Sequence, residues 1–205
     1  MKTVVVLIGG FVLGVLATAA GGWLYIHHAM ETIAASSNSV PIDAAARFER
    51  SRNKLRAAQT EYERWLALTD GVLWSVDISP APVVREEAAL VLTIAEKNRN
   101  DWNYGNAIHR ANIALGRLAL RDGNVEQAKR YLIEAGKTPG SPQLNSFGPS
   151  MLLAQELLER GEAAIVVEYI DLCSQFWNPL FGMGSTWKKL IAEGKRPNFA
   201  ANLLY

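Results

Sequence analysis

A short turn at Gly123-Asn124 constrains the fold most, because it joins two stretches of helical pattern. Residues 103–121 before it carry a broad apolar surface, and residues 125–136 after it carry an apolar stripe at helical spacing. Gly123 suits the left-handed conformation that follows a helix C-terminus, and Asn124 with Gln127 has the spacing of a capping box. Two helices joined by so short a turn pack against each other, so the sequence predicts a helical hairpin.

This hairpin resembles a tetratricopeptide repeat, whose pattern is W-x2-L-G-x2-Y, then A-x3-F, then P. The matching positions are Asn112-x2-Leu115-Gly116-x2-Ala119, then Ala128-x3-Leu132, then Ala135 and Pro139. Asn112 and Ala119 stand where the pattern has aromatic residues. The resemblance implies an all-α fold of antiparallel helical hairpins, an α-solenoid fragment with a concave groove that binds other proteins. The runs W-N-Y-G-N-A-I-H and G-K-T-P-G-S-P-Q-L-N-S-F-G-P also resemble uncharacterised bacterial proteins, which implies no activity.

Weaker copies of the hairpin are expected on both sides of it. The patterns that begin at Ala88, Ala128 and Val166 share one spacing and recur at intervals of 40 and 38 residues. These intervals exceed the 34 residues of an uninterrupted tetratricopeptide repeat, so the connections must carry insertions, such as residues 137–149. Further helices are expected at about 42–69, 83–98, 151–160, 162–176 and 186–193, with an apolar loop over 70–82, which makes about seven helices in all.

The helix expected over 42–69 is rich in basic residues that stand beside glutamates. They are Arg47, Arg50, Arg52, Lys54 and Arg56. We interpret them as a solvated helix face, with contact to anionic lipid as the alternative.

Three arginines define the candidate binding face. Arg110, Arg117 and Arg121 are spaced by seven and four residues, so they lie on one face of their helix. The tetratricopeptide resemblance places them in the concave groove, where arginine would bind an acidic segment or a free C-terminus. Asn106 and Asn112 are neighbouring candidates for hydrogen bonds to an extended backbone. The alternative interpretation is a solvated basic stripe, with Arg121 favouring the helix C-terminus.

The N-terminal stretch predicts a membrane segment. Residues 4–26 contain no charge and would form a helix of about 35 Å, enough to cross a hydrocarbon core of about 30 Å. Lys2 precedes the stretch and no Lys or Arg follows until Arg47, so the N-terminus is expected in the cytoplasm and the body outside it. A cleaved signal peptide is the alternative, because residues 17–19 read Ala-Thr-Ala.

Small residues recur every fourth position along this stretch and would line one face of the helix. They are Gly10, Gly14, Thr18 and Gly22. Such faces permit close packing of helices in lipid, so they are the candidate contact for a homo-oligomer. The plainer interpretation is that anchors and signal sequences are often rich in glycine and alanine.

The composition points away from several classes of function. A formal net charge of +1 argues against a nucleic-acid binder held by a strong basic field. A single cysteine, Cys173, excludes an intrachain disulfide and a multi-cysteine zinc site. His109 is the one histidine of the expected folded body that could serve Cys173 as a base, and no familiar catalytic or phosphate-binding motif occurs. We therefore expect no catalytic residues, no metal and no cofactor, and we interpret Cys173 as a buried small residue.

The sequence divides into an anchor or signal peptide over 1–28, a linker over 29–41, a helical repeat-like domain over 42–198 and an apolar tail over 199–205. The function expected from this organisation is a scaffold or chaperone-like adaptor that holds other proteins at the cytoplasmic membrane, facing the periplasm or cell exterior. A secreted protein is the alternative location. A structural subunit of a larger membrane complex is the alternative function, and an enzyme is the least favoured.

Overall fold

The computed structural model of the protein describes residues 43–178 and 182–204. The helices are α2 (Ala44–Ala57), α3 (Glu61–Ser75), α4 (Ala81–Lys97), α5 (Tyr104–Arg121), α6 (Val125–Gly136), α7 (Pro142–Phe147), α8 (Leu152–Glu159), α9 (Ala163–Cys173), α10 (Met183–Ala192) and the 3-10 helix η2 (Ala200–Leu203). This part of the chain contains no strand, which confirms the all-α class. It has nine α-helices instead of the seven expected, because one expected helix is two and because α7 was not foreseen.

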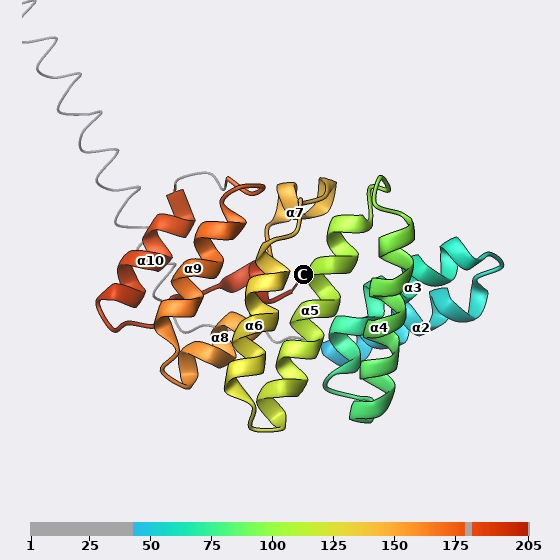
Figure 1. The fold of residues 1–205 in the computed structure, drawn as a ribbon, viewed down its shortest axis with the longest axis horizontal. Helices are drawn as coiled ribbons and strands as arrows, with labels where there is room; N and C mark the ends of the chain where they lie inside the picture. Colours follow the sequence, from blue (N-terminus) through green and yellow to red (C-terminus); the bar gives the residue numbers. More distant parts are fainter. Residues whose placement is uncertain (1–42, 179–181, 205) are drawn as a thin grey trace, which may run out of the picture.

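The helices lie side by side in one elongated row, from α10 at one end to α2 at the other (Figure 1). Helices that are consecutive in the chain pack together in the pairs α2–α3, α3–α4, α5–α6 and α8–α9. The central helix α5 also packs against α3, α4, α7 and α8, and α6 packs against α9. Because α5 touches so many neighbours, its side chains decide how the two halves of the row fit together.

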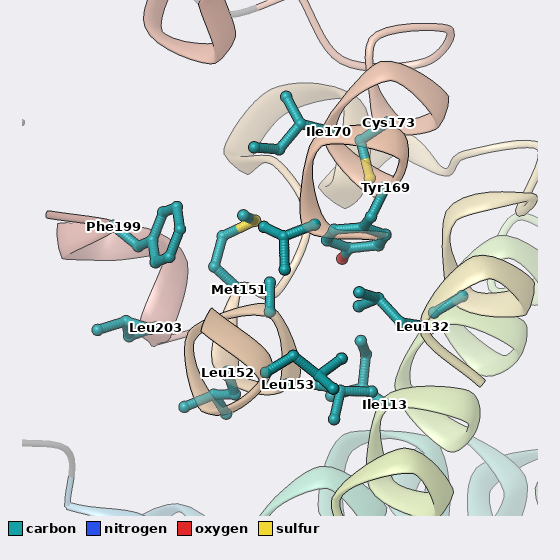
Figure 2. Close-up of a cluster of buried hydrophobic side chains, with 14 of the residues drawn as sticks. Ile113, Leu132, Met151, Leu152, Leu153, Tyr169, Ile170, Cys173, Phe199 and Leu203 are labelled. Carbon is teal, nitrogen blue, oxygen red and sulfur yellow. The ribbon is translucent and has the colours of Figure 1, made fainter. Parts of the chain in front are cut away.

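Two clusters of buried apolar side chains form the core, and α5 contributes to both. The cluster shared with α3 and α4 takes Ala107, Ala111, Ala114 and Leu118 from α5. The cluster shared with α6, α8, α9, α10 and η2 takes Ile113, Ala119 and Leu120. In this second cluster, Leu132 of α6, Leu153 of α8 and Tyr169 of α9 gather around Ile113 (Figure 2). A helix that is apolar on two faces is buried between two layers, as the broad apolar surface of this sequence predicts.

The single helix expected over 42–69 is wrong, because the chain breaks between α2 and α3. Ala58 is extended, and Thr60 begins α3 with a capping box. The Thr60 hydroxyl accepts from the Glu63 N–H at 3.1 Å, and the Glu63 carboxylate accepts from the Thr60 N–H at 3.0 Å. These two bonds satisfy donors that a helix start leaves unpaired, so they favour a new helix over continuation of the old one.

The apolar loop expected over 70–82 is also largely wrong, because α3 continues to Ser75. Gly71 lies inside α3, where a Cβ would come 2.4 Å from Ser51 Oγ of α2. Glycine therefore serves close packing of the two helices here instead of ending one of them. Val72 and Leu73 are fully buried within the chain, and only the short connection from Val76 to Pro80 is left as a loop.

The α5–α6 hairpin forms as predicted. Gly123 has φ +77°, and the Asn124 side chain accepts from the Gln127 N–H at 3.0 Å. A Cβ on Gly116 would lie 2.2 Å from Leu153 Cδ2, so the small residue expected at this position lets α8 approach α5.

The segment after α6 and the C-terminal tail are both parts of the folded body. The expected insertion at residues 137–149 contains α7, which packs on α5. In the tail, Phe199 and Leu203 are buried in the second cluster, and the Asn202 amide donates to the carbonyls of Phe147 and Pro149 at 3.2 and 3.0 Å. The tail therefore covers one end of the core.

The predicted membrane segment over 4–26, including Gly10, Gly14, Thr18 and Gly22, lies outside the described residues. Among the helices of residues 43–178 and 182–204, none has the length and apolar character that crossing a membrane requires.

Candidate binding cleft

All three predicted arginines form ion pairs within the chain, and two of them share the carboxylate of Asp77. Arg117 donates to both carboxylate oxygens of Asp77 at 2.9 and 3.1 Å, and its Nε donates to Glu156 at 2.7 Å. Arg121 donates to Asp77 at 2.5 Å and to the Val76 carbonyl. We call Arg117, Arg121, Asp77 and Glu156 the arginine clamp, because they tie the end of α3 and the side of α8 to α5.

The arginine at the centre of the clamp is held in its charged form. The Arg117 side chain is only 8% exposed. Burial lowers the pKa of Arg117, but the carboxylates of Glu156 and Asp77 raise it by more, so the net shift is upward. A buried guanidinium with three charge-assisted bonds is a strong internal connection.

The three remaining predicted residues separate into two environments. The Asn112 amide donates to the Ile108 carbonyl one turn earlier at 2.8 Å, and the residue is buried within the helix packing. Asn106 and Arg110 instead line a cleft at the beginning of α5. The structure therefore brings only these two of the five predicted binding residues together on one concave surface.

The cleft has a volume of about 470 Å³ and lies between α2, α3, the start of α5 and α7. Its apolar lining is Ala57, Ala58, Leu66, Ala67 and Trp102. Its charged lining is Lys54, Glu63, Asp70 and Arg110, and its amide lining is Asn103, Asn106 and Gln143. This volume falls within the range of about 300–1,000 Å³ that is common for ligand sites.

The amide side of the cleft is a connected network with one donor left over. Asn106 Nδ2 donates to Asn103 Oδ1 and to Gln143 Oε1, each at 3.1 Å, and Ser141 Oγ donates to Asn106 Oδ1 at 2.6 Å. Asn103 is 3% exposed, yet its Nδ2 has no hydrogen-bond partner. Buried polar groups are almost always paired, so an unpaired amide on the wall of a cleft calls for an explanation.

An aromatic pair forms the outer edge of the cleft. Trp102 is 46% exposed, and its indole N–H donates to the Tyr62 hydroxyl at 2.9 Å. That hydroxyl donates to Asp101 at 3.1 Å, which holds both rings in place on the surface. Ordered aromatic rings with an exposed apolar face are common at protein interfaces.

A smaller recess of about 150 Å³ adjoins the cleft and shares Lys54, Asp70 and Arg110 with it. Its other lining residues are Arg47, Arg50, Ser51 and Trp74, and we call it the basic recess. Asp70 accepts from Lys54 and from Arg110, each at 2.6 Å. Burial raises the pKa of Asp70, but Arg110 and Lys54 lower it by more, so the carboxyl stays ionised.

His109 and Cys173, the one pair that could have been catalytic, are both buried in structural contacts. His109 Nε2 accepts from the Ser150 N–H at 2.9 Å, so Nδ1 carries the proton and donates to the Ala135 carbonyl at 3.0 Å. Burial lowers the pKa of His109 to about 4 and raises that of the Cys173 thiol. Cys173 is 1% exposed, which confirms the role of a buried small residue that was expected for it. Ala95 and Ala135, which occupy the same position in the recurring pattern, are also fully buried. The place of Cys173 in the core is visible in Figure 2.

Several cleft residues were not among the sequence-based candidates. Trp102 and Asn103 directly precede α5, and Gln143 belongs to α7 within the expected insertion. Lys54 and its basic neighbours in α2 were noted only as a solvated face or a lipid contact. The tryptophan of the W-N-Y-G-N run was a usable local signal, because Trp is highly buried on average, whereas asparagine is common at helix starts.

Searches for related proteins returned no matching family model, no matching curated protein and no matching solved structure.

Proposed function

We propose that the protein is a membrane-anchored scaffold or chaperone-like adaptor that binds segments of other proteins in the cleft between α2, α3, α5 and α7. The observation that carries this proposal is the buried, unpaired amide donor of Asn103 on the cleft wall. A buried donor without a partner costs about 1–3 kcal/mol. Asn103 lines the cleft, so a rotation of its side chain would let a carbonyl oxygen of a bound polypeptide accept from this amide and remove that cost.

The remainder of the cleft suits an extended polypeptide. Asn106 and Gln143 are side-chain amides that can bond the donors and acceptors of a backbone, and the alanines with Leu66 give an apolar surface for alternate side chains. Trp102 at the edge adds a rigid aromatic contact. The carboxylates of the lining are already engaged: Glu63 caps α3, and Asp70 pairs with Lys54 and Arg110.

The order of the helices supports a tetratricopeptide-like arrangement. The first helices of three successive hairpins, α3, α5 and α8, are in contact in that order, and the second helices α6 and α9 also touch. Stacked helical hairpins of this kind present an inner surface made by their first helices. The cleft lies against two of these first helices, α3 and α5.

The uncharged stretch over 4–26 supports the location that we propose, with the N-terminus in the cytoplasm and the body in the periplasm or cell exterior. We propose no reaction for the protein. Both ring nitrogens of His109 are bonded to backbone groups, so this histidine has no free atom with which to act as a base.

A structural subunit of a larger complex is the alternative. Residues 72–76 and the tail residues Phe199 and Leu203 are buried within the chain itself, so they offer no surface to a neighbouring subunit. The observation in its favour is instead on α4, where Val83 and Leu90 are seven residues apart and both are exposed. An adaptor should persist in cells that lack its partner, whereas an orphaned subunit should be degraded.

Site-specific photo-cross-linking in the native membrane tests the proposal. A photoreactive residue at Ala57, which is exposed and lines the cleft, should capture partner proteins. The same residue at Glu168, which is exposed on α9 away from the cleft, is the matched control and should capture none of them. Equal capture at both positions, or capture at neither, would contradict binding in the cleft.

A further inference from the structure

We propose that the basic recess beside the cleft binds a carboxylate group of the polypeptide that the cleft holds. The inference rests on the proposed function and adds the chemistry that selects the partner. The recess and the cleft share Lys54, Asp70 and Arg110, so a segment lying in the cleft reaches the recess without crossing another element.

The recess has more positive charge than the described residues neutralise. Its charged residues are the cations Arg47, Arg50, Lys54 and Arg110 and a single carboxylate, Asp70. Asp70 is shared between Lys54 and Arg110. Four cations around a concave surface repel one another and focus a positive potential into it, so the recess favours an added anion.

Two of these cations have no carboxylate partner among the described residues. The Arg47 guanidinium lies over the Trp74 ring at 5.1 Å from its centroid, and it forms no ion pair within that part of the chain. Arg50 is exposed and makes no side-chain bond to any described residue. Arg110 uses only Nη1 for Asp70, so its other N–H groups stay available for a second acceptor.

A carboxylate is the anion that the surroundings favour. At Asp70, burial raises the pKa of the carboxyl, but Arg110 and Lys54 lower it by more, so the same cations favour the charged form of a bound carboxylate. The recess, at about 150 Å³, has room for one such group at the end of a chain or on a short side chain. A guanidinium binds a carboxylate through two parallel bonds, which would also fix the direction of the segment in the cleft.

The full-length protein in lipid nanodiscs provides the test. Short random peptides are selected on it in two display formats, one with a free C-terminus and one as an internal loop. The selected peptides are then synthesised with a C-terminal carboxylate or amide, and with Asp and Glu or Asn and Gln. We expect replacement of the critical carboxylate to weaken binding about tenfold or more, and the format that shows this loss identifies a C-terminal or side-chain source.

The protein variants are Arg50→Gln and Arg56→Gln, which remove the same charge from the same helix. Arg56 is exposed, pairs with Glu49 and does not line the recess. Arg50→Gln should weaken a selected acidic peptide about tenfold, as loss of one charge-assisted bond implies, and Arg56→Gln should not.

Peptides that bind in the cleft but tolerate both carboxylate removal and Arg50→Gln would overturn the carboxylate inference alone. Binding that requires phosphorylated peptides would overturn it as well. Selection of no peptide in either format would overturn both this inference and the proposed function. A Gln143→Ala variant distinguishes failure of the carboxylate inference from failure of binding in the cleft. It should weaken the binding of every peptide that uses the cleft, whether acidic or neutral.

Discussion

The arginines at the two ends of α5 have different numbers of carboxylate partners. At the C-terminal end, Arg117 and Arg121 face Asp77 and Glu156, so two cations meet two carboxylates in the arginine clamp. At the N-terminal end, Arg110 joins three further cations around Asp70 alone. The clamp is electrically complete and holds the fold together, whereas the recess is incomplete and remains open.

This difference shows that spacing along a helix does not identify a binding residue by itself. A stripe of arginines predicts only which side chains share a face. The number of carboxylates that the neighbouring helices bring to each arginine decides whether it becomes structural or available. Mutations at the two ends should therefore differ in their effect on stability.

The largest difference should come from matched arginine substitutions. Arg117→Met should lower the free energy of unfolding by about 3 kcal/mol, because it removes the Glu156 contact and two of the three bonds that the arginines donate to Asp77. Arg110→Met should cost less than about 1 kcal/mol, because Lys54 still pairs with Asp70. Urea unfolding followed by tryptophan fluorescence measures both. Equal losses would break the distinction between the two ends.

The buried His109 of α5 should make the free energy of unfolding depend on pH. His109 has a pKa of about 4 in the folded protein and about 6.5 when unfolded, so the unfolded state takes up the proton first as pH falls. The contribution of neutral His109 to the free energy of unfolding is therefore fully present above about pH 6.5. It is lost towards pH 4, and about 2 kcal/mol of it is gone at pH 5. Urea midpoints at several pH values check this, and His109→Gln should flatten the dependence in that window. An unchanged profile would contradict the neutral, buried histidine.

The C-terminal tail is also part of the core, and a mutation there should have a smaller effect on stability. Asn202→Ala should lower the free energy of unfolding by about 1.5 kcal/mol, because the carbonyls of Phe147 and Pro149 lose their shared donor. Thermal unfolding by circular dichroism provides the measurement, with Asn124→Gly as a capping variant of small expected cost. If Asn202→Ala were neutral, the tail would not be part of the core.

The smallest effect on stability should come from a mutation in the basic recess. Arg50→Gln should change the free energy of unfolding by less than about 0.5 kcal/mol, since the side chain is exposed and has no partner among the residues that the structure describes. The same unfolding measurement applies to Arg50→Gln and Arg56→Gln. A loss of more than 1 kcal/mol for Arg50→Gln would mean that this arginine belongs to the fold in the way that Arg117 does.

Local signals account for what sequence reasoning predicted correctly. Gly123 and Asn124 ended one helix and began the next through contacts within a few residues, which a linear pattern can represent. The break before α3 was equally local, because Thr60 and Glu63 have capping-box spacing, yet one unbroken helix was expected over 42–69. Gly71 lies where the loop over 70–82 was expected to begin, and only the position of Ser51 on α2 explains why it is a packing contact inside a helix.

The candidate site was recoverable only in part, because its residues are far apart in the chain. Asn106 and Arg110 were predicted from the α5 pattern, but Lys54 and Gln143 come from α2 and α7. The unpaired donor of Asn103 has no sequence signature at all. It follows from which acceptors the folded chain places near the amide.

The sequence by itself determined the all-α class, the central hairpin with its Asn124 cap and the near-neutral charge, because these depend on propensities and contacts among neighbouring residues. The tertiary structure alone decided which arginines are enclosed, where the cleft opens and what the tail covers. The physical reason is that charge pairing and burial depend on distances between segments, and the spacing of residues along one helix does not specify those distances.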